Sequence, residues 1–173
     1  MTTSPSASGI SRFVLQLLEI MRLRSGPQDL PAGWGLAFLL ALLYMLEGLV
    51  ADYMLSEGDA APRSLVSVSI QFAAIAALLG FRRFSMRLPQ TITALSGTGL
   101  AFGALSIVLA LQARPGAAQP LLVLAWVSAF VWSLVVDAHI YRRALSINMS
   151  LGMLVAVLIF ALNFVVVEQL FTP

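Results

Sequence analysis

Residues 34–55 read WGLAFLLALLYMLEGLVADYML, an apolar run whose first charged residue is Glu47, followed by Asp52 near its end. A transmembrane helix needs about 20 mostly apolar residues, with about 17 as the lower limit, so this run can cross a bilayer. Further apolar runs of sufficient length lie at residues 65–81, 91–112, 120–138 and 147–171. We therefore predict an all-α, polytopic integral membrane helix bundle, with five transmembrane helices in one membrane domain at residues 34–173.

The composition of the whole chain agrees with a membrane protein. Of its 173 residues, 60% are hydrophobic and only 10% are charged, whereas soluble domains carry roughly 25% charged residues. The net charge of +2 comes with arginines divided among short segments, and no long basic stripe indicates nucleic-acid binding. With no cysteine and one histidine, the chain excludes disulfides, thiolate metal sites and multi-histidine sites of its own. We expect the lipid bilayer as its environment, and no cofactor or metal.

The distribution of arginine predicts the orientation of the helices. Most arginines precede the first run or lie in the second and fourth connections between runs, and short arginine-rich segments stay in the cytoplasm. The N-terminus is therefore expected in the cytoplasm and the C-terminus in the periplasm or outside the cell. The absence of lysine, with abundant alanine and leucine, indicates a GC-rich bacterial genome, and hence the bacterial inner (cytoplasmic) membrane. Candidate contacts to lipid head groups are Arg12, Arg22, Arg24, Arg82, Arg83, Arg142 and Arg143.

The segment before the first run has three parts. Residues 1–9 are small and polar, which predicts a disordered tail. Residues 10–25 are predicted to form an amphipathic interfacial helix, too short and too charged to cross a membrane. This helix lies either on the cytoplasmic leaflet or against the cytoplasmic ends of its own bundle, and docking to a partner protein is a third alternative. Residues 26–33 form an elbow, in which Gly26 ends the helix and Pro27 prevents its continuation. The predicted apolar face of the helix at residues 10–25 comprises Ile10, Phe13, Val14, Leu17, Leu18 and Met21.

Glu47 is the main candidate for an intramembrane site. It lies about 8 residues, or roughly 12 Å, from the outer end of its helix. A carboxylate at that depth is unfavourable by several kcal/mol unless it is neutralised, solvated or paired. Counting from the outer ends of the other runs places a candidate polar cluster at the same depth: Gln71, Ser106, Ser128 and Asn163. Such a cluster is either a proton or substrate site or a structural hydrogen-bond network.

Two further patterns have competing interpretations. Gly99 and Gly103, in GLAFG, form a GxxxG pattern that allows close helix contact, either inside the bundle or with another subunit. Asp137 and His139 suggest a pH-sensitive pair, but residues two apart on a helix do not face each other. We therefore interpret Asp137, Tyr141, Arg142 and Arg143 as an anchoring collar at the cytoplasmic interface.

No motif for catalysis is present, which favours a non-enzymatic protein. GxSxG, HExxH and a phosphate-binding glycine loop are all absent. The layout resembles the Yip1-type family of five-span membrane proteins: a cytoplasmic amphipathic helix (SRFVLQLLEIMRLR), a turn containing proline (GPQDLP) and five close-packed spans. Eukaryotic members of that family are associated with vesicle trafficking and small GTPases. The resemblance implies a fold and transfers no site residues.

These observations favour a scaffold or accessory subunit of a bacterial inner-membrane complex. Its partner would be another membrane protein or a second copy of the chain. The alternative is a small transporter or channel component, with an intramembrane polar site around Glu47, Gln71 and Asn163.

Overall fold

The computed structural model describes residues 9–55, 63–114 and 118–171, and within these ranges every regular element is a helix. The elements are α1 (Gly9–Met21), η1 (Pro27–Asp29), α2 (Trp34–Leu55), α3 (Arg63–Phe81), η2 (Ser85–Arg87), α4 (Leu88–Ala110), α5 (Pro120–Leu145) and α6 (Met149–Phe171). The last five α-helices, α2 to α6, are long and apolar enough to cross a membrane. This result confirms the prediction of an all-α bundle with five candidate spans. The expected tail at residues 1–9 lies almost wholly outside the described residues.

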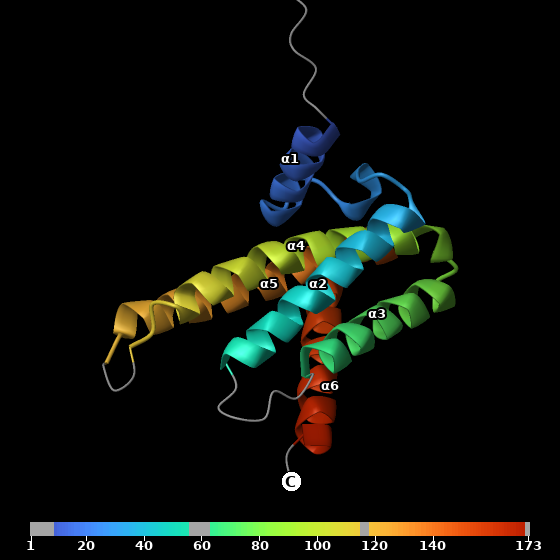
Figure 1. Ribbon diagram of the computed structural model, residues 1–173. Coiled ribbons are helices and arrows are strands. Elements are labelled where there is room, and N and C mark those ends of the chain that lie inside the picture. Colours follow the sequence, from blue (N-terminus) through green and yellow to red (C-terminus); the bar gives the residue numbers. More distant parts are fainter. Residues whose placement is uncertain (1–8, 56–62, 115–117, 172–173) are drawn as a thin grey trace, which may run out of the picture.

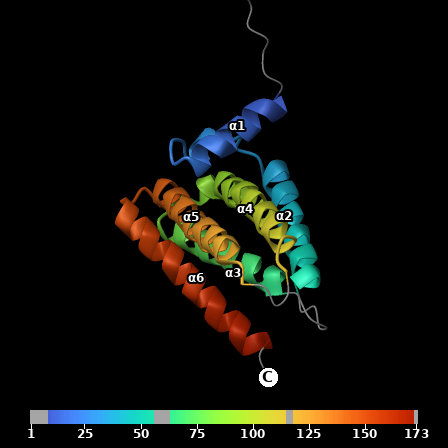
Figure 2. The ribbon, with the colours of Figure 1, turned by 90° about the vertical axis from the view of Figure 1, so that its left-hand side faces the viewer.

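The five long helices form a closed ring. Going around it, α2 packs on α4, α4 on α5, α5 on α6, α6 on α3, and α3 on α2 (Figure 1). The α1 helix lies across one end of the bundle, and the C-terminus lies at the other (Figures 1 and 2). We call these the α1 end and the opposite end. Because the chain alternates direction, α2, α4 and α6 begin at the α1 end, whereas α3 and α5 finish there.

The core is concentrated at the α1 end. Its buried residues come mainly from the first half of α4, between Pro89 and Thr98, and from the last third of α5, between Val136 and Leu145. Buried threonine hydroxyls of α4 donate to carbonyls in the preceding turn of the same helix, as Thr93 does to Pro89 at 2.8 Å. These side chains therefore need no partner from another helix. The opposite halves of the helices are more exposed.

The outward faces of the helices are apolar. On α2, Phe38, Leu42 and Leu46 recur every fourth residue and are 65%, 55% and 48% exposed. Exposed large apolar side chains are also numerous on α5 and α6, and such side chains are what lipid chains cover in a membrane protein. The bundle therefore has the surface of a multi-pass membrane protein.

Three helices stop at the α1 end with the same backbone turn. Leu23, Arg83 and Ser146 adopt left-handed φ angles of 63°, 59° and 54° after α1, α3 and α5. In each case the next residue donates its N–H to a carbonyl five residues earlier, as Arg24 does to Glu19 at 2.9 Å. This turn satisfies carbonyls that the helix end leaves free. The α1 helix therefore ends before Gly26, which corrects the predicted stop at that glycine.

The end of α5 also differs from the sequence-based expectation. The run at residues 120–138 was expected to finish at an interfacial collar, but α5 continues to Leu145. His139 and Tyr141 are each 1% exposed, and the His139 ring donates to the Ser25 carbonyl at 2.8 Å. The collar interpretation is therefore wrong for Tyr141. The expectation fails because α1 and the elbow cover the last turns of α5. His139 and Tyr141 are therefore inside the protein.

The α1 helix packs against the bundle with only part of its apolar surface. Ile20 is fully buried, and Phe13, Leu17 and Met21 pack on the core. The Leu17 side chain fits over Gly97 of α4, where a methyl group would lie 2.8 Å from it. Of the predicted alternatives for residues 10–25, the structure shows packing against the chain's own bundle. The position of this helix at the membrane interface stays a prediction. The remaining apolar side chains are exposed: Ile10 (78%), Val14 (47%), Leu15 (57%) and Leu18 (41%).

The elbow is a structured joint. The Asp29 carboxylate accepts the Gly26 N–H at 2.8 Å, which closes the 3-10 turn η1. From α4, the Gln90 amide donates to the Leu30 carbonyl at 2.7 Å, and from α1, Gln16 donates to the Asp29 carbonyl at 2.9 Å. These bonds fix the orientation of α1 relative to α2.

Candidate functional site

A cavity with several polar lining residues lies inside the ring, between α2, α3, α5 and α6. Its volume is about 420 Å³, within the usual range for small-ligand sites. Apolar side chains from α5 and α6 make up much of its wall. The polar lining residues are Tyr44, Ser67, Gln71, Ser133, Asp137, Tyr141, Asn163 and Glu168.

Asp137, Gln71 and Tyr141 form the hydrogen-bonded centre of this cavity. The Gln71 amide nitrogen donates to Oδ2 of Asp137 at 3.3 Å and to the Tyr141 hydroxyl at 3.0 Å. Ser133, Asp137 and Tyr141 follow each other at intervals of four residues, so α5 presents them on one face. Gln71 reaches them from α3, across the ring. We call Gln71, Asp137 and Tyr141 the polar centre.

The position of Asp137 makes its carboxyl group unusual. It lies 8 residues before Leu145, the last residue of α5, which is about 12 Å along the helix. Among the described residues it has no ion-pair partner, since the salt bridge found there joins Arg22 and Glu19. Acids inside membrane segments are unfavourable without a partner, and they mark ion or substrate pathways more often than other residues do.

A second cavity, of about 240 Å³, adjoins the first. The two share Tyr44, Gln71, Ser133 and Asp137, while Ser106 of α4 lines only the second. The polar centre therefore stands between two spaces, one toward α6 and one toward α4. A group bound at Asp137 could be reached from either.

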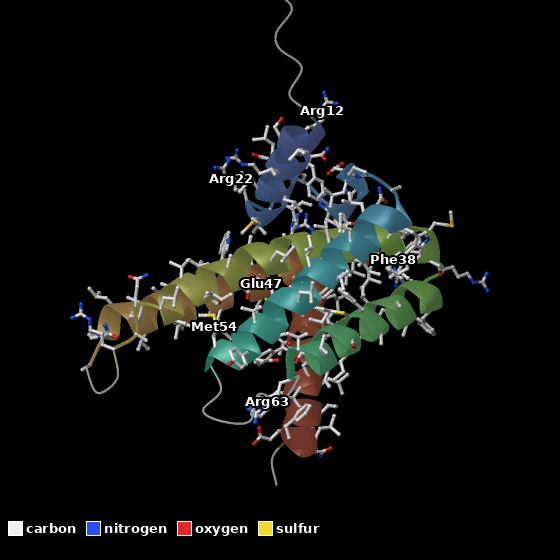
Figure 3. All side chains as sticks on the ribbon, viewed as in Figure 1. Arg12, Arg22, Phe38, Glu47, Met54 and Arg63 are labelled. Carbon is white, nitrogen blue, oxygen red and sulfur yellow. The ribbon has the colours of Figure 1, made fainter. Side chains whose placement is uncertain are left out.

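The structure gives Glu47 a different position from the one expected. It lies midway along α2 (Figure 3), and its carboxylate packs on Gly103 of α4, where a methyl group would lie 2.5 Å from Oε2. It lines neither cavity. Ser128, expected in the same cluster, is exposed on α5. The polar layer is thus centred on Asp137 instead of Glu47, because α2 turns Glu47 toward α4.

Gln71 and Asn163, the other predicted members of the site, do line the larger cavity. The Oδ1 atom of Asn163 is buried there and has no hydrogen-bond partner in the part of the chain that the structure describes. A buried acceptor without a partner is unfavourable. It is therefore available to a ligand with a donor group, or to water.

The two candidate packing glycines serve contacts within the chain. The Tyr44 ring of α2 lies over Gly99, where a methyl group would come within 2.7 Å of it, and Glu47 lies over Gly103. Close approach of α2 and α4 therefore needs both glycines. Because α2 covers this face, it is not available to another subunit.

The predicted head-group arginines gather at the α1 end, as Figure 3 shows for Arg12 and Arg22, whereas Arg63 lies at the opposite end. Arg22 pairs with Glu19 at 3.4 Å. Arg82 donates to the Leu145 carbonyl at 3.3 Å, so it caps α5 in addition to being exposed. The remaining members of the predicted set are Arg24, Arg83, Arg142 and Arg143, of which the last two line a pocket described below.

The sequence patterns pointed only partly to this site. Depth counted from the helix ends selected Gln71 and Asn163, but Asp137 was assigned to the interface because arginines follow it closely. The signal that identifies it is the four-residue spacing from Ser133 to Tyr141. Comparison with known proteins found no matching family model, curated protein or solved structure.

Proposed function

We propose that this chain is a non-enzymatic, multi-pass protein of the bacterial inner membrane that binds a small positively charged solute or a proton at Asp137, as a small transporter or channel component. The observation that carries this proposal is that polar side chains of four helices line one cavity around an unpaired intramembrane acid. Polar groups that face a cavity at this depth are typical of a transport pathway.

The charge of the cavity favours a cation. Its lining contains the carboxyl groups of Asp137 and Glu168 and no arginine. Glu168 lies on α6 close to the opposite end, whereas Asp137 is deeper. A cation that entered from the opposite end would therefore meet one acid near the surface and a second one within the membrane.

The arginines support an orientation with the α1 end in the cytoplasm. Eight arginines belong to segments at the α1 end, against Arg63 and Arg114 at the opposite end. The cavity would then be entered from the periplasm. A reporter enzyme that works only outside the cytoplasm, fused after the last residue, should be active, and an inactive but stable fusion would reject this topology.

Flux measurements with matched variants test the transport proposal. The purified full chain would be placed in liposomes, and entry of protons, potassium and methylammonium followed with ion-sensitive dyes. Asp137→Asn should abolish flux that wild type supports. Glu47→Gln is the control, because it removes an intramembrane carboxylate that does not line the cavity. Absence of wild-type flux for all three probes, or equal loss in both variants, would count against the proposal.

A chemical probe tests the same site without assuming a solute. A lipid-soluble carbodiimide adds to protonated carboxyl groups in membrane proteins. Mass spectrometry of the treated protein should find the adduct on Asp137 and none in Asp137→Asn. An adduct confined to Glu47 would move the site back to α2.

The second candidate function is the scaffold or accessory subunit, and the exposed apolar side chains of α1 favour it. Ile10, Val14 and Leu18 recur at intervals of four residues on the side of α1 that its own bundle leaves open. The resemblance to Yip1-type proteins supports the same layout. Its partner would be a membrane protein or a second copy of the chain. This proposal predicts that Val14→Glu disrupts a complex purified in mild detergent, whereas Asp137→Asn leaves that complex intact.

A further inference from the structure

A separate pocket lies at the α1 end, between the elbow, η2 and the connection from α5 to α6. Its volume is about 420 Å³, and its lining consists of Gln28, Arg87, Arg142, Arg143, Ser146 and Ile147. Half of these residues are arginines and none is acidic. Two segments that are far apart in the sequence, η2 and the end of α5, thus bring positive charge to one place.

One arginine of this pocket, Arg87, is held in place by three contacts. Nη1 of Arg87 donates to the Ala144 carbonyl at 3.0 Å and to the Ser146 hydroxyl at 2.8 Å, and its guanidinium lies over the Phe84 ring at 4.3 Å. Arg142 and Arg143 lie on the last turn of α5. Arg87 therefore has a fixed position, and some of its five N–H donors are still free for a ligand.

One donor at this pocket lacks a partner. Nε of Arg143 is buried and makes no hydrogen bond within the described ranges. A buried charged donor is unfavourable unless an acceptor meets it. An anion in the pocket is the type of group that would supply several acceptors at once.

No acid lines this pocket. Glu19 pairs with Arg22 on α1, and the Asp29 carboxylate accepts the Gly26 N–H in the elbow. The other acids among the described residues belong to the spanning helices. The three arginines therefore face a pocket without a carboxylate in its lining.

We propose that this pocket binds a phosphate group, and that the phosphate belongs to the head group of an anionic lipid. Arginine forks match the paired oxygens of a phosphate. The pocket lies where α5 ends and α6 begins, at the level that head groups occupy beside a spanning helix. Ile147 adds an apolar wall for the lipid part. This proposal does not depend on the cavity at Asp137.

The test uses the purified full chain in a neutral detergent. The probes are dioctanoyl phosphatidic acid, dioctanoyl phosphatidylcholine and inorganic phosphate, and binding is measured by native mass spectrometry. Phosphatidic acid should bind more tightly than phosphatidylcholine, whose choline cation finds no acid here. Each charged hydrogen bond lost should weaken binding about tenfold. The double variant Arg142→Gln with Arg143→Gln should therefore weaken the binding of phosphatidic acid at least about tenfold.

The matched control is Arg114→Gln, which removes an exposed arginine at the opposite end, outside the pocket. Its affinity for phosphatidic acid should stay within about twofold of wild type. Arg142→Lys is a milder variant that keeps the charge and loses the fork, and it should show an intermediate loss. Inorganic phosphate that competes fully at the same concentration would support the site and identify a soluble phosphate as its ligand. Equal binding of both lipids, no binding, or an equal loss in Arg114→Gln would overturn the proposal.

Discussion

Gly152→Ala tests the close contact of α5 and α6 that forms one wall of the cavity. A methyl group at Gly152 would lie 2.5 Å from the Ala138 carbonyl oxygen, which is 0.9 Å short of the 3.4 Å at which ordinary contact begins. The obstacle is backbone, so no side-chain rotation can relieve it, and Cβ of Arg142 closes the other side at 3.0 Å. The two helices must therefore move apart.

The expected loss of stability is about 1–3 kcal/mol, as for other overpacked cores. It corresponds to about a 5- to 140-fold fall in the folding equilibrium constant. Unfolding of the purified protein by increasing fractions of SDS in mixed micelles, followed by circular dichroism, measures this loss. Displacement of α6 should also disturb the cavity, because Ala156 and Asn163 of α6 line it.

Gly80→Ala is the control for this prediction. No atom lies within 4 Å of a methyl group at Gly80, and alanine favours a helix over glycine by up to about 1 kcal/mol. Gly80→Ala should therefore leave stability unchanged or raise it. Wild-type stability in Gly152→Ala, or an equal loss in both variants, would refute the packing argument.

The remaining predictions concern the helix ends at the α1 end. Arg87→Gln removes charged hydrogen bonds to the end of α5 and should lower the free energy of unfolding by about 1–3 kcal/mol in the same SDS assay; an unchanged value would show that these bonds add nothing to stability. Arg83→Gly should have the opposite effect and raise the free energy of unfolding by about 0.5–1 kcal/mol. Arg83 is exposed, and its φ of 59° is more favourable for glycine than for arginine. A loss in Arg83→Gly would indicate that the side chain makes a contact that outweighs the relief of strain.

The spans could be predicted from the sequence because crossing a membrane is a local property. A run such as residues 34–55 has enough apolar residues in succession, whatever it packs against. The arginine bias could also be predicted, because it depends only on which connecting segments contain arginine. The ends of the helices were predicted less well: α5 continues to Leu145, and α1 and the elbow cover its last turns.

The candidate site could be predicted only in part. Depth along a helix follows from residue number, so Gln71 and Asn163 were found without the structure. The direction in which a side chain points does not follow from depth. Glu47 and Asp137 are both acids within spanning helices, yet Glu47 packs on Gly103 and Asp137 lines two cavities.

The sequence by itself determined that this is a five-span helical membrane protein with few charges in its spans and most arginines in the segments at one end. Tertiary structure alone decided which helices are neighbours, that Gly99 and Gly103 accept α2, and that Gln71 meets Asp137 across the ring. The physical reason is the membrane. In water the hydrophobic face of a helix marks its inner side, but lipid is as apolar as the protein core, so spans that are apolar all round do not show which face turns inward.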